Sequence, residues 1–523
     1  MTKIAFAAAL LASAVTMIVP ASSQARPDES KRIQPTTTLV QRQAVVRTPE
    51  QMDAFDATFV TPSTLHQVPF ARPTMDAAAY EQMKNPTQQT SKPGAGGTSS
   101  PSPLVSILKF TGANYCDGPG GCWYPPDVAG TIGKSNWVSV SNDVIEIRSR
   151  AGLLQKINSL NGFFGYSAQA MFDPRVQWDE EYQRWVITAD AFQESASVQY
   201  LGVAVSTTSS ATGPFYIYFT NTASFDGNAF WDYPMLGLSQ DAAIFTANVF
   251  GTNFQGSYLF AVAKARIYNG YGWSVPVYTG LNATLQPARQ LAEDQSPYAW
   301  LAAAVGSGVN MYAYLDPANP SLSILYGPYA VSGIGAYSGP PSAPQPASCG
   351  SGLLDSLDGR FQNQGTQDGD LYYQTHTVGS GSFAIPKLYQ IKGLLGFAPV
   401  AAINNYYYAS ASSQDFNPSI GVDNQGHFAL NWSSTDPGTG RPASMYYADN
   451  RLATPLNATG INVFTGTCWS GTGTSRWGDY SQTSVDWGTG SIFNTVTKPF
   501  WITNEYFNNV SGAWSTEVAK VPF

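Results

Sequence analysis

The sequence predicts an all-β protein, and specifically a seven-bladed β-propeller, from three observations. An Asp, alone or in a short cluster, precedes an apolar, aromatic-rich segment six times, with a weaker seventh case at Asp294. Consecutive anchors lie 46 to 64 residues apart by subtraction, a repeat length typical of propeller blades. The 13% aromatic residues, 48 Gly and 35 Pro favour short strands and turns over long helices. The other anchors are Asp127, Asp173, Asp232, Asp358, Asp415 and Asp479.

Residues 1–25 have the features of an export signal. Lys3 gives a positive start, residues 4–19 are almost entirely apolar, and Ser23-Gln24-Ala25 offers a cleavage site after its last residue. The apolar run is short for a membrane span, so a retained anchor is the less favoured alternative. We therefore expect a secreted protein, periplasmic or extracellular.

Residues 26–103 are predicted to form a flexible leader or linker. They are rich in Gln, Thr, Pro, Ala and Ser, and Ser91–Pro103 is nearly all small residues and Pro. Short helical pieces are expected near Pro49–Phe55 and Met75–Lys84. The composition fits a propeptide as well as a spacer.

Residues 104–523 are predicted to be the propeller domain. Each segment between anchors holds about four short apolar runs separated by Gly, Asn, Asp and Ser turns. The last segment, from Asp479 to Phe523, is short, and Leu104–Phe110 is a candidate for the strand it lacks. Closing the ring in this way removes open sheet edges. A six-bladed ring is the next choice, and two stacked β-sandwiches are the main alternative.

The charge bears on which partners the protein binds, and the cysteine content bears on its disulfides. The net charge of −8 disfavours nucleic acid and anionic membranes, and we expect a monomer that meets an extracellular glycan or a surface protein. Four Cys allow three pairings. We favour a tight loop closed by Cys116–Cys122 and a long-range bridge between Cys349 and Cys468, because export permits disulfides. A metal site at these Cys is less favoured, since their spacing is not of the zinc type.

Several stretches resemble a family of secreted bacterial β-propellers. They are PPDVAGTIG from Pro125, DPRVQWDEEYQRW from Asp173, WDYPMLGLS from Trp231, LDGRF from Leu357 and RWGDYSQTSVD from Arg476 with the later WITNEY. The resemblance covers about residues 104–523 and implies fold and export, without a particular activity.

A looser resemblance is to sialidases and other proteins with Asp-box repeats, whose pattern is Ser-x-Asp-x-Gly-x-Thr-Trp. Residues 484–490 (SVDWGTG) and 434–440 (STDPGTG) keep the Ser, Asp and Gly but lack the closing Thr-Trp. In that superfamily the box is a structural turn, so the resemblance implies a related fold.

The anchors are expected to meet at one mouth of the propeller, because innermost strands begin there. Two interpretations compete. In the structural one, each Asp ties neighbouring blades together by accepting backbone N–H bonds or pairing with Arg. In the functional one, the convergent groups bind a ligand, with guanidinium forks suited to carboxylates. The expected substrate-binding residues are Arg175, Arg360, Arg476, Tyr233, Asp479 and His376.

Catalytic candidates follow from the functional interpretation. Tyr480 or Tyr233, paired with Glu505, would act as nucleophile and base, and Asp127 or Asp232 would act as the general acid with a raised pKa. Alternatively, His376 and a Tyr would abstract a proton from a uronate, as in a lyase. We expect no cofactor, although Asp368-Gly369-Asp370 is a candidate for a structural calcium ion.

Two function hypotheses remain. The first is a hydrolase or lyase that binds and processes an acidic glycan at the mouth, and the second is a non-catalytic propeller that binds carbohydrate or protein. Three arginines in one pocket with free forks would favour the first hypothesis. Arginines each buried against an Asp would favour the second.

Overall fold

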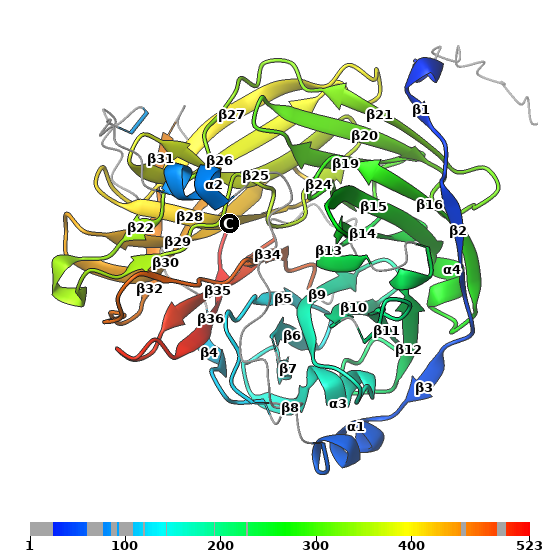
Figure 1. Ribbon diagram of the computed structural model, residues 1–523, viewed down its shortest axis with the longest axis horizontal. Coiled ribbons are helices and arrows are strands. Elements are labelled where there is room, and N and C mark those ends of the chain that lie inside the picture. Colours follow the sequence, from blue (N-terminus) through cyan, green and yellow to red (C-terminus); the bar gives the residue numbers. More distant parts are fainter. Residues whose placement is uncertain are drawn as a thin grey trace, which may run out of the picture.

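The computed structural model describes residues 25–59, 77–84, 92–93, 108–118, 121–142, 144–192, 194–225, 229–450, 457–488 and 498–523. Strands dominate these ranges, and their helices are short, so the predicted all-β class is confirmed. Figure 1 shows sets of strands arranged around a common centre, the arrangement of a β-propeller. The predicted export signal lies outside the described residues except for its last residue.

The strands fall into sets of four antiparallel neighbours. The first two sets are β5 (Ala129–Ile132), β6 (Asn136–Ser141), β7 (Val144–Ser149), β8 (Leu154–Ser159), and β9 (Met171–Asp179), β10 (Arg184–Ala191), β11 (Tyr200–Ser206), β12 (Phe215–Asn221). The next two are β13 (Phe230–Leu238), β14 (Ala242–Phe250), β15 (Phe254–Ala263), β16 (Trp273–Leu281), and β17 (Gln286–Pro287), β19 (Tyr298–Ala304), β20 (Val309–Leu315), β21 (Ile324–Ala330).

Three further sets follow along the chain. They are β24 (Thr366–Asp368), β25 (Leu371–Ser380), β26 (Phe383–Lys392), β27 (Val400–Tyr408); then β28 (Gln414–Val422), β29 (Phe428–Asp436), β30 (Arg441–Asp449), β32 (Ile461–Thr465); and β34 (Gln482–Val485), β35 (Phe500–Phe507), β36 (Trp514–Val521), β4 (Leu108–Asn114). The strand β4 comes from before the first anchor and pairs with β36, with Phe110 opposite Val518. This confirms the prediction that the segment ahead of the first anchor completes the last set.

Neighbouring sets meet through their innermost strands and their apolar faces. The strand β9 contacts both β5 and β13, and β34 contacts both β5 and β28. The short strand β18 (Arg289–Gln290) pairs in parallel with β13 and β24, which joins their two sets into one eleven-stranded sheet. Between two sets, Val186 and Val203 pack with Phe245 and Phe260 in one buried cluster. The core is therefore a series of layers between sheets, as expected when faces of twisted sheets pack around an axis.

Part of the predicted leader is built into the domain. The strands β1 (Arg32–Ile33), β2 (Thr37–Gln41) and β3 (Val45–Arg47) add outer strands beside β21, β16 and β12, and Figure 1 shows this segment running along the outside of the ring. These described residues therefore cover three sheet edges instead of forming a spacer. The sequence hid this role because the added strands are short and half exposed.

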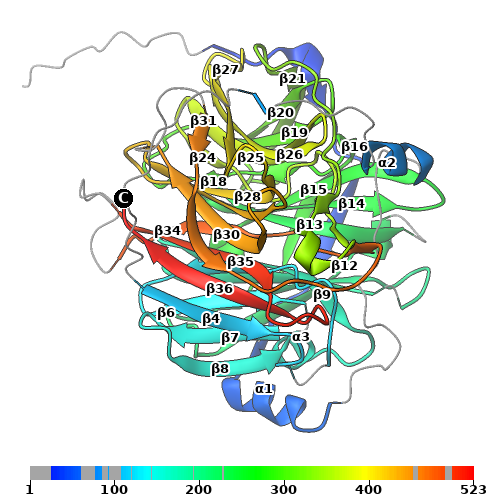
Figure 2. The same cartoon turned by 90° about the vertical axis from the view of Figure 1, so that its left-hand side faces the viewer.

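Both short helices expected in the leader are present. The helix α1 (Pro49–Asp56) begins with Pro, and Thr48 forms a capping box with Gln51, the usual start signal of a helix. The carboxyl groups of Asp53 and Asp56 then accept bonds from the β8 residue Asn158. The helix α2 (Ala77–Lys84) lies elsewhere on the ring, and Figure 2 shows the two helices well separated. No helix in the described ranges has the length and hydrophobicity to cross a bilayer.

The remaining elements are short and lie in connections between or within the sets. They are η1 (Glu29–Lys31), α3 (Leu160–Phe164), η2 (Thr222–Phe225), α4 (Lys264–Ile267), β22 (Ala343–Pro344), η3 (Ala347–Cys349), β23 (Leu353–Leu354), β31 (Asn457–Thr459) and β33 (Thr474–Ser475). Three of these strands form a small sheet in the order β22–β23–β33. This small sheet matters because the chain passes from its strands directly into two of the predicted site segments.

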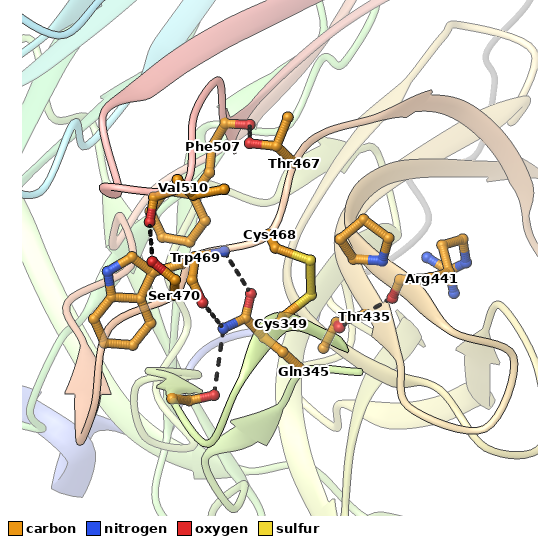
Figure 3. The surroundings of a disulfide bond; sticks show 12 residues. Gln345, Cys349, Thr435, Arg441, Thr467, Cys468, Trp469, Ser470, Phe507 and Val510 are labelled. Atoms are coloured by element: carbon orange, nitrogen blue, oxygen red, sulfur yellow. Dashed lines mark hydrogen bonds between the residues drawn. A yellow bond between two sulfur atoms is a disulfide. The ribbon is translucent and has the colours of Figure 1, made fainter. Parts of the chain in front are cut away.

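Both predicted disulfides are confirmed, Cys116–Cys122 and Cys349–Cys468. The second bridges 119 residues and joins η3 to the segment ahead of β33. Figure 3 shows its surroundings, where Gln345 donates to the carbonyl of Trp469 at 3.0 Å and accepts from the Trp469 N–H at 3.1 Å. The disulfide therefore reinforces the parallel pairing of β23 with β33.

Removing the long-range bridge should destabilise the protein more than removing the short one. In the chain-entropy model, a loop of about 120 residues corresponds to about 5 kcal/mol and a loop of about seven to about 2 kcal/mol. We expect the double variant Cys349→Ser/Cys468→Ser to lose more free energy of unfolding than Cys116→Ser/Cys122→Ser, measured by urea denaturation. Equal losses would contradict this ranking.

Candidate functional site

A repeated β-bulge aims side chains at the centre of the ring. In β9, β13 and β28, the two-residue segments 173–174, 233–234 and 417–418 each stand opposite a single residue of the next strand. Each begins with a residue of positive φ and ends with Pro: 51° at Asp173, 60° at Tyr233 and 51° at Asn417. Bulges of this kind redirect a side chain locally. A left-handed backbone at residues other than Gly is uncommon and persists where surrounding contacts enforce it.

The bulges show that the acidic anchors are not equivalent positions. Asp173 corresponds to Tyr233 and Asn417, whereas Asp232 lies one residue earlier and corresponds to Phe172. The repeat in the sequence is therefore a repeat of backbone geometry, which several residue types satisfy. Asp415 lies two residues before its bulge and accepts from Trp432 and Lys92 instead of joining the centre.

Carboxyl and phenol groups from different sets bond across the ring. The Tyr480 hydroxyl donates to Asp173 at 2.7 Å, and the Asp479 N–H donates to Asp127 at 2.6 Å. Tyr233 donates to the carbonyl of Asp479 at 3.3 Å, and the N–H of Gly478 donates to Glu505 at 2.5 Å. The structure thus brings together the four predicted catalytic residues and most of the predicted binding residues. We call Asp127, Asp173, Asp190, Asp232, Asp479, Glu505, Tyr233 and Tyr480 the central cluster.

The three arginines are engaged with the protein itself. Arg175 donates to the carbonyls of Pro234 and Gln362, both at 3.1 Å, and its guanidinium carbon lies 3.2 Å from the ring centre of Tyr480. Arg360 holds Asp358 through two bonds of 2.7 Å, and Arg476 donates to Asp479 at 3.0 Å. The geometry matches the structural interpretation, in which each guanidinium balances carboxylates or backbone carbonyls.

Burial dominates the protonation of the central cluster. Burial, followed by the charge of Asp173, raises the pKa of Asp127 to about 7, and burial raises that of Asp173, Asp232 and Asp479 to about 7 as well. Burial also raises the pKa of Glu505 well above its ordinary value. Desolvation disfavours a charged carboxylate and crowding by other carboxylates adds to the effect, so the cluster shares protons near neutral pH.

Asp190 belongs to the central cluster, although it was not among the residues predicted from the sequence. It is fully buried in β10, and within the described part of the chain neither carboxyl oxygen has a hydrogen-bond partner. Burial, with the charges of Asp173 and Asp232, raises its pKa well above the ordinary value. No sequence signal marked it, because it lies in the second strand of its set and not at an anchor.

Other predicted residues take structural roles. The ring of His376 is fully buried, with Nδ1 2.7 Å from the Gly359 carbonyl and Nε2 2.9 Å from the Tyr389 hydroxyl. Burial lowers its pKa to about 3, so the imidazole is a weak base, and both ring nitrogens already bond within the protein. Asp294 accepts from the N–H of Ser296 in a turn.

The candidate calcium segment forms a turn. Asp370 accepts from the N–H groups of Gly393 and Leu395, at 3.0 and 2.8 Å. Across the described residues, no three His, Cys, Asp or Glu side chains are grouped in a way suited to a metal ion.

An open pocket adjoins the central cluster. Its volume is about 510 Å³, within the range of small-molecule sites. It lies at the end of the ring where the innermost strands begin, because its walls include residues just before β17 and β24. We call it the mouth pocket, and it is lined by Met83, Asn282, Ala283, Thr284, Ala304, Val305, Gly306, Tyr337, Gly339, Asp358, Gly359 and Arg360.

The mouth pocket offers unused hydrogen-bonding groups. Asn282 accepts two bonds through Oδ1, from Asn310 at 3.0 Å and Tyr312 at 2.8 Å, and the Tyr337 hydroxyl accepts from the N–H of Gly306 at 3.0 Å. Among the described residues, no partner accepts from Asn282 Nδ2, the Tyr337 hydroxyl or Arg360 Nη1. Asp358 remains an acceptor: burial raises its pKa, but the charge and hydrogen bonds of Arg360 outweigh burial and leave the pKa below the ordinary value.

Comparison with protein-family models finds no match, and comparison with curated protein sequences finds none either. Among solved structures, the fold resembles a Trypanosoma rangeli sialidase in complex with the inhibitor DANA, with a TM-score of 0.37 and 11% identity over 76% of this chain and 60% of that chain. The chain thus spans less than two thirds of that sialidase.

Two glycosidases are also similar. An exo-β-1,3-galactanase from Phanerochaete chrysosporium with galactose has a TM-score of 0.29 and 12% identity over 80% of this chain and 99% of that chain. A thermostable family-43 glycoside hydrolase has a TM-score of 0.27 and 12% identity over 56% and 90%. At these identities and TM-scores, the similarities give no information on the chemistry of the site in this chain.

The buried carboxyl groups predict an unusual dependence of stability on pH. Their pKa values are raised in the folded state and near 4 in the unfolded chain, so the folded state binds more protons between about pH 4 and pH 7. The free energy of unfolding should therefore fall as pH rises through this window. We expect the free energy of unfolding of Asp190→Asn to fall less steeply from pH 5 to pH 8 than that of the wild type in chemical denaturation, because one titrating group contributes up to about 1.4 kcal/mol per pH unit.

The exposed residue Asp241 provides the matched control. Asp241→Asn should keep the wild-type pH dependence. Parallel pH profiles for Asp190→Asn and the wild type would show that Asp190 does not hold a proton in the folded protein.

Proposed function

We propose that the protein is an exported β-propeller that binds a glycan in the mouth pocket without cleaving it. The observation that carries this proposal is the pocket itself, with donors and an ionised acceptor side by side on its wall. Arg360 Nη1 and the Asp358 carboxylate are held in place by the bidentate pair between these residues. A neighbouring donor and acceptor of fixed geometry suit the hydroxyl groups of a sugar, which both donate and accept.

The remaining walls of the pocket agree with a hydroxyl-rich ligand. Asn282 and Tyr337 add one amide donor and one hydroxyl, while Ala283, Ala304 and Val305 supply small apolar surface. Ligand sites generally combine apolar walls with a few fixed polar groups. A pocket of this volume has room for one or two sugar rings, so the proposed ligand is a terminal mono- or disaccharide unit.

Binding is favoured over cleavage by the arrangement of carboxyl groups. Hydrolysis of a glycosidic bond commonly uses two carboxyl groups, one of them a protonated acid. Among the described residues that line the pocket, Asp358 is the one carboxyl group, and its lowered pKa suits an acceptor better than an acid. The former catalytic candidates Asp127, Asp232, Tyr480 and Glu505 are all at most 4% exposed.

Hydrolysis is the second candidate function, and one observation favours it. The pKa of about 7 at Asp127 and Asp232 would suit a general acid at neutral pH. These groups would need to become accessible to substrate. If the protein converted a bound glycan into hydrolysis products, the hydrolase function would replace the binding function proposed here.

The charge of the pocket does not favour an acidic ligand over a neutral one. Arg360 is neutralised by Asp358 at 2.7 Å, and Arg175 and Arg476 are engaged elsewhere in the protein. The earlier expectation of an acidic glycan depended on three open guanidinium forks. We therefore propose recognition of sugar hydroxyls, with uronate-containing glycans as the comparison in the test.

We also propose that the ring has seven blades and that the protein is exported. The blade count is supported by seven sets of four strands and by β4, which joins the last set from the other end of the domain. Export is supported by the predicted signal and by two disulfides, since such bonds persist in oxidising compartments.

Binding should depend on the Tyr337 hydroxyl. Loss of one hydrogen bond corresponds to about 1 kcal/mol, so we expect Tyr337→Phe to weaken binding about fivefold to tenfold. The measurement is a screen of the purified protein on an array of neutral and uronate-containing glycans, followed by calorimetric titration of the best ligand and chromatography for products. Tyr271→Phe, at a half-exposed tyrosine outside the pocket, is the matched control. Unchanged affinity in Tyr337→Phe, or no glycan bound by the wild type, would refute the proposal.

A further inference from the structure

The helix α2 docks beside the mouth pocket through a buried lysine. Lys84 is 4% exposed, and its ammonium group donates to Asp355 at 2.9 Å, to the Ser356 hydroxyl at 3.0 Å and to the carbonyl of Leu357. Tyr80, one turn earlier on the helix, donates to the same Asp355 at 2.9 Å. A buried ion pair with additional hydrogen bonds holds its partners in one geometry, because breaking it leaves an uncompensated charge.

These contacts fix the backbone immediately before the pocket's Asp358–Arg360 pair. Leu357 has a φ of 57°, in the left-handed region that disfavours residues other than Gly. Its N–H donates to Asp355 at 3.0 Å, and its carbonyl accepts from Lys84. Both peptide groups of the strained residue are therefore held by one ion pair, and release of that pair would let the following residue, Asp358, shift.

A second residue of α2 forms part of the pocket wall. Met83 lines the mouth pocket together with Gly339. A Cβ atom placed on Gly339 would lie only 2.0 Å from the Met83 sulfur, so the two residues are in close contact. A flexible thioether in this position limits the space on one side of the pocket.

We propose that α2 shapes the mouth pocket, with Lys84 as a positioning residue for the Asp358–Arg360 pair and Met83 as a wall that limits ligand size. The inference rests on the proposed glycan site and adds the element that determines its form. Although α2 precedes the strand sets in the sequence, it contributes directly to the structure of the site. The chain supplies the pocket's geometry from two places far apart in sequence.

The test compares two buried lysines of the same segment. Lys92 is 3% exposed and pairs with Asp415 at 2.9 Å, away from the residues that line the mouth pocket. We expect Lys84→Met to accelerate amide hydrogen exchange in residues 355–361 at least tenfold and to weaken glycan binding at least tenfold. Lys92→Met should lower the melting temperature to a similar extent while leaving exchange at 355–361 and binding unchanged.

Hydrogen exchange needs no ligand, so it separates this inference from the proposed function. If the wild type binds no glycan but exchange responds as expected, the function fails while the positioning role stands. Unchanged exchange at 355–361 in Lys84→Met, or equal acceleration in Lys92→Met, would overturn the positioning role. If Lys84→Met does not fold, amide hydrogen exchange in the wild type tests the positioning role instead. Similar protection of residues 77–84 and 355–361 would support that role, and much faster exchange of residues 77–84 would overturn it.

The role of Met83 has its own readout. Met83→Ala keeps the ion pair and enlarges the pocket, so affinity should shift towards larger ligands among glycans that the wild type binds. The expected change is at least threefold in the ratio of disaccharide to monosaccharide affinity by titration. An unchanged ratio would remove Met83 from the proposal and leave Lys84 in place.

Discussion

The main physical constraint on this structure is that several carboxyl groups are buried at the centre of the ring of sheets. Taking an ionised carboxylate out of water costs several kcal/mol unless it is paired, hydrogen-bonded or protonated. All three solutions are represented: Arg476 pairs with Asp479, Tyr480 donates to Asp173, and burial raises the pKa of Asp190, which has no hydrogen-bond partner among the described residues and is thereby favoured in its protonated form. The bonds from Tyr480 to Asp173 and from Asp479 to Asp127 join residues more than 300 positions apart, so the centre helps to specify which sets meet as well as stabilising them.

The bulges at the start of the innermost strands are the backbone counterpart of this constraint. An unbroken strand would direct successive side chains to opposite faces of its own sheet. An extra residue with positive φ, followed by Pro, turns a side chain towards the axis instead. Asp173, Tyr233 and Asn417 occupy that same position with three different chemical groups. The ring therefore needs a polar group there that reaches a partner, and a carboxylate is only one way of supplying it.

The sequence was sufficient for features that repeat and insufficient for features that occur once. The spacing of the anchors, both disulfides, the two short helices and the completing strand ahead of Asp127 were predictable because each has a local or periodic signal. Asp190 had none, since it is a single acidic residue in the second strand of its set, away from every anchor. The edge strands of residues 32–47 were missed because a short strand on the outside of a sheet has no buried face to create alternation. Arg360 and Arg476 pair with the nearby Asp358 and Asp479, as the structural interpretation expected, whereas Arg175 donates to backbone carbonyls that no sequence pattern reveals.

In a repetitive fold, a ligand site is best sought where the chain departs from the repeat. Positions that every set shares are explained by the geometry of the ring, so they give little information about a ligand. The chain departs most from the repeat between β21 and β24, residues 331–365. This segment contributes Tyr337, Gly339, Asp358 and Arg360 to the mouth pocket, carries one end of the long-range disulfide and receives Lys84 from α2. This break in the repeat is secured by a disulfide, a small sheet and a buried ion pair. These contacts hold the segment in one geometry, which the proposed ligand site in the mouth pocket needs.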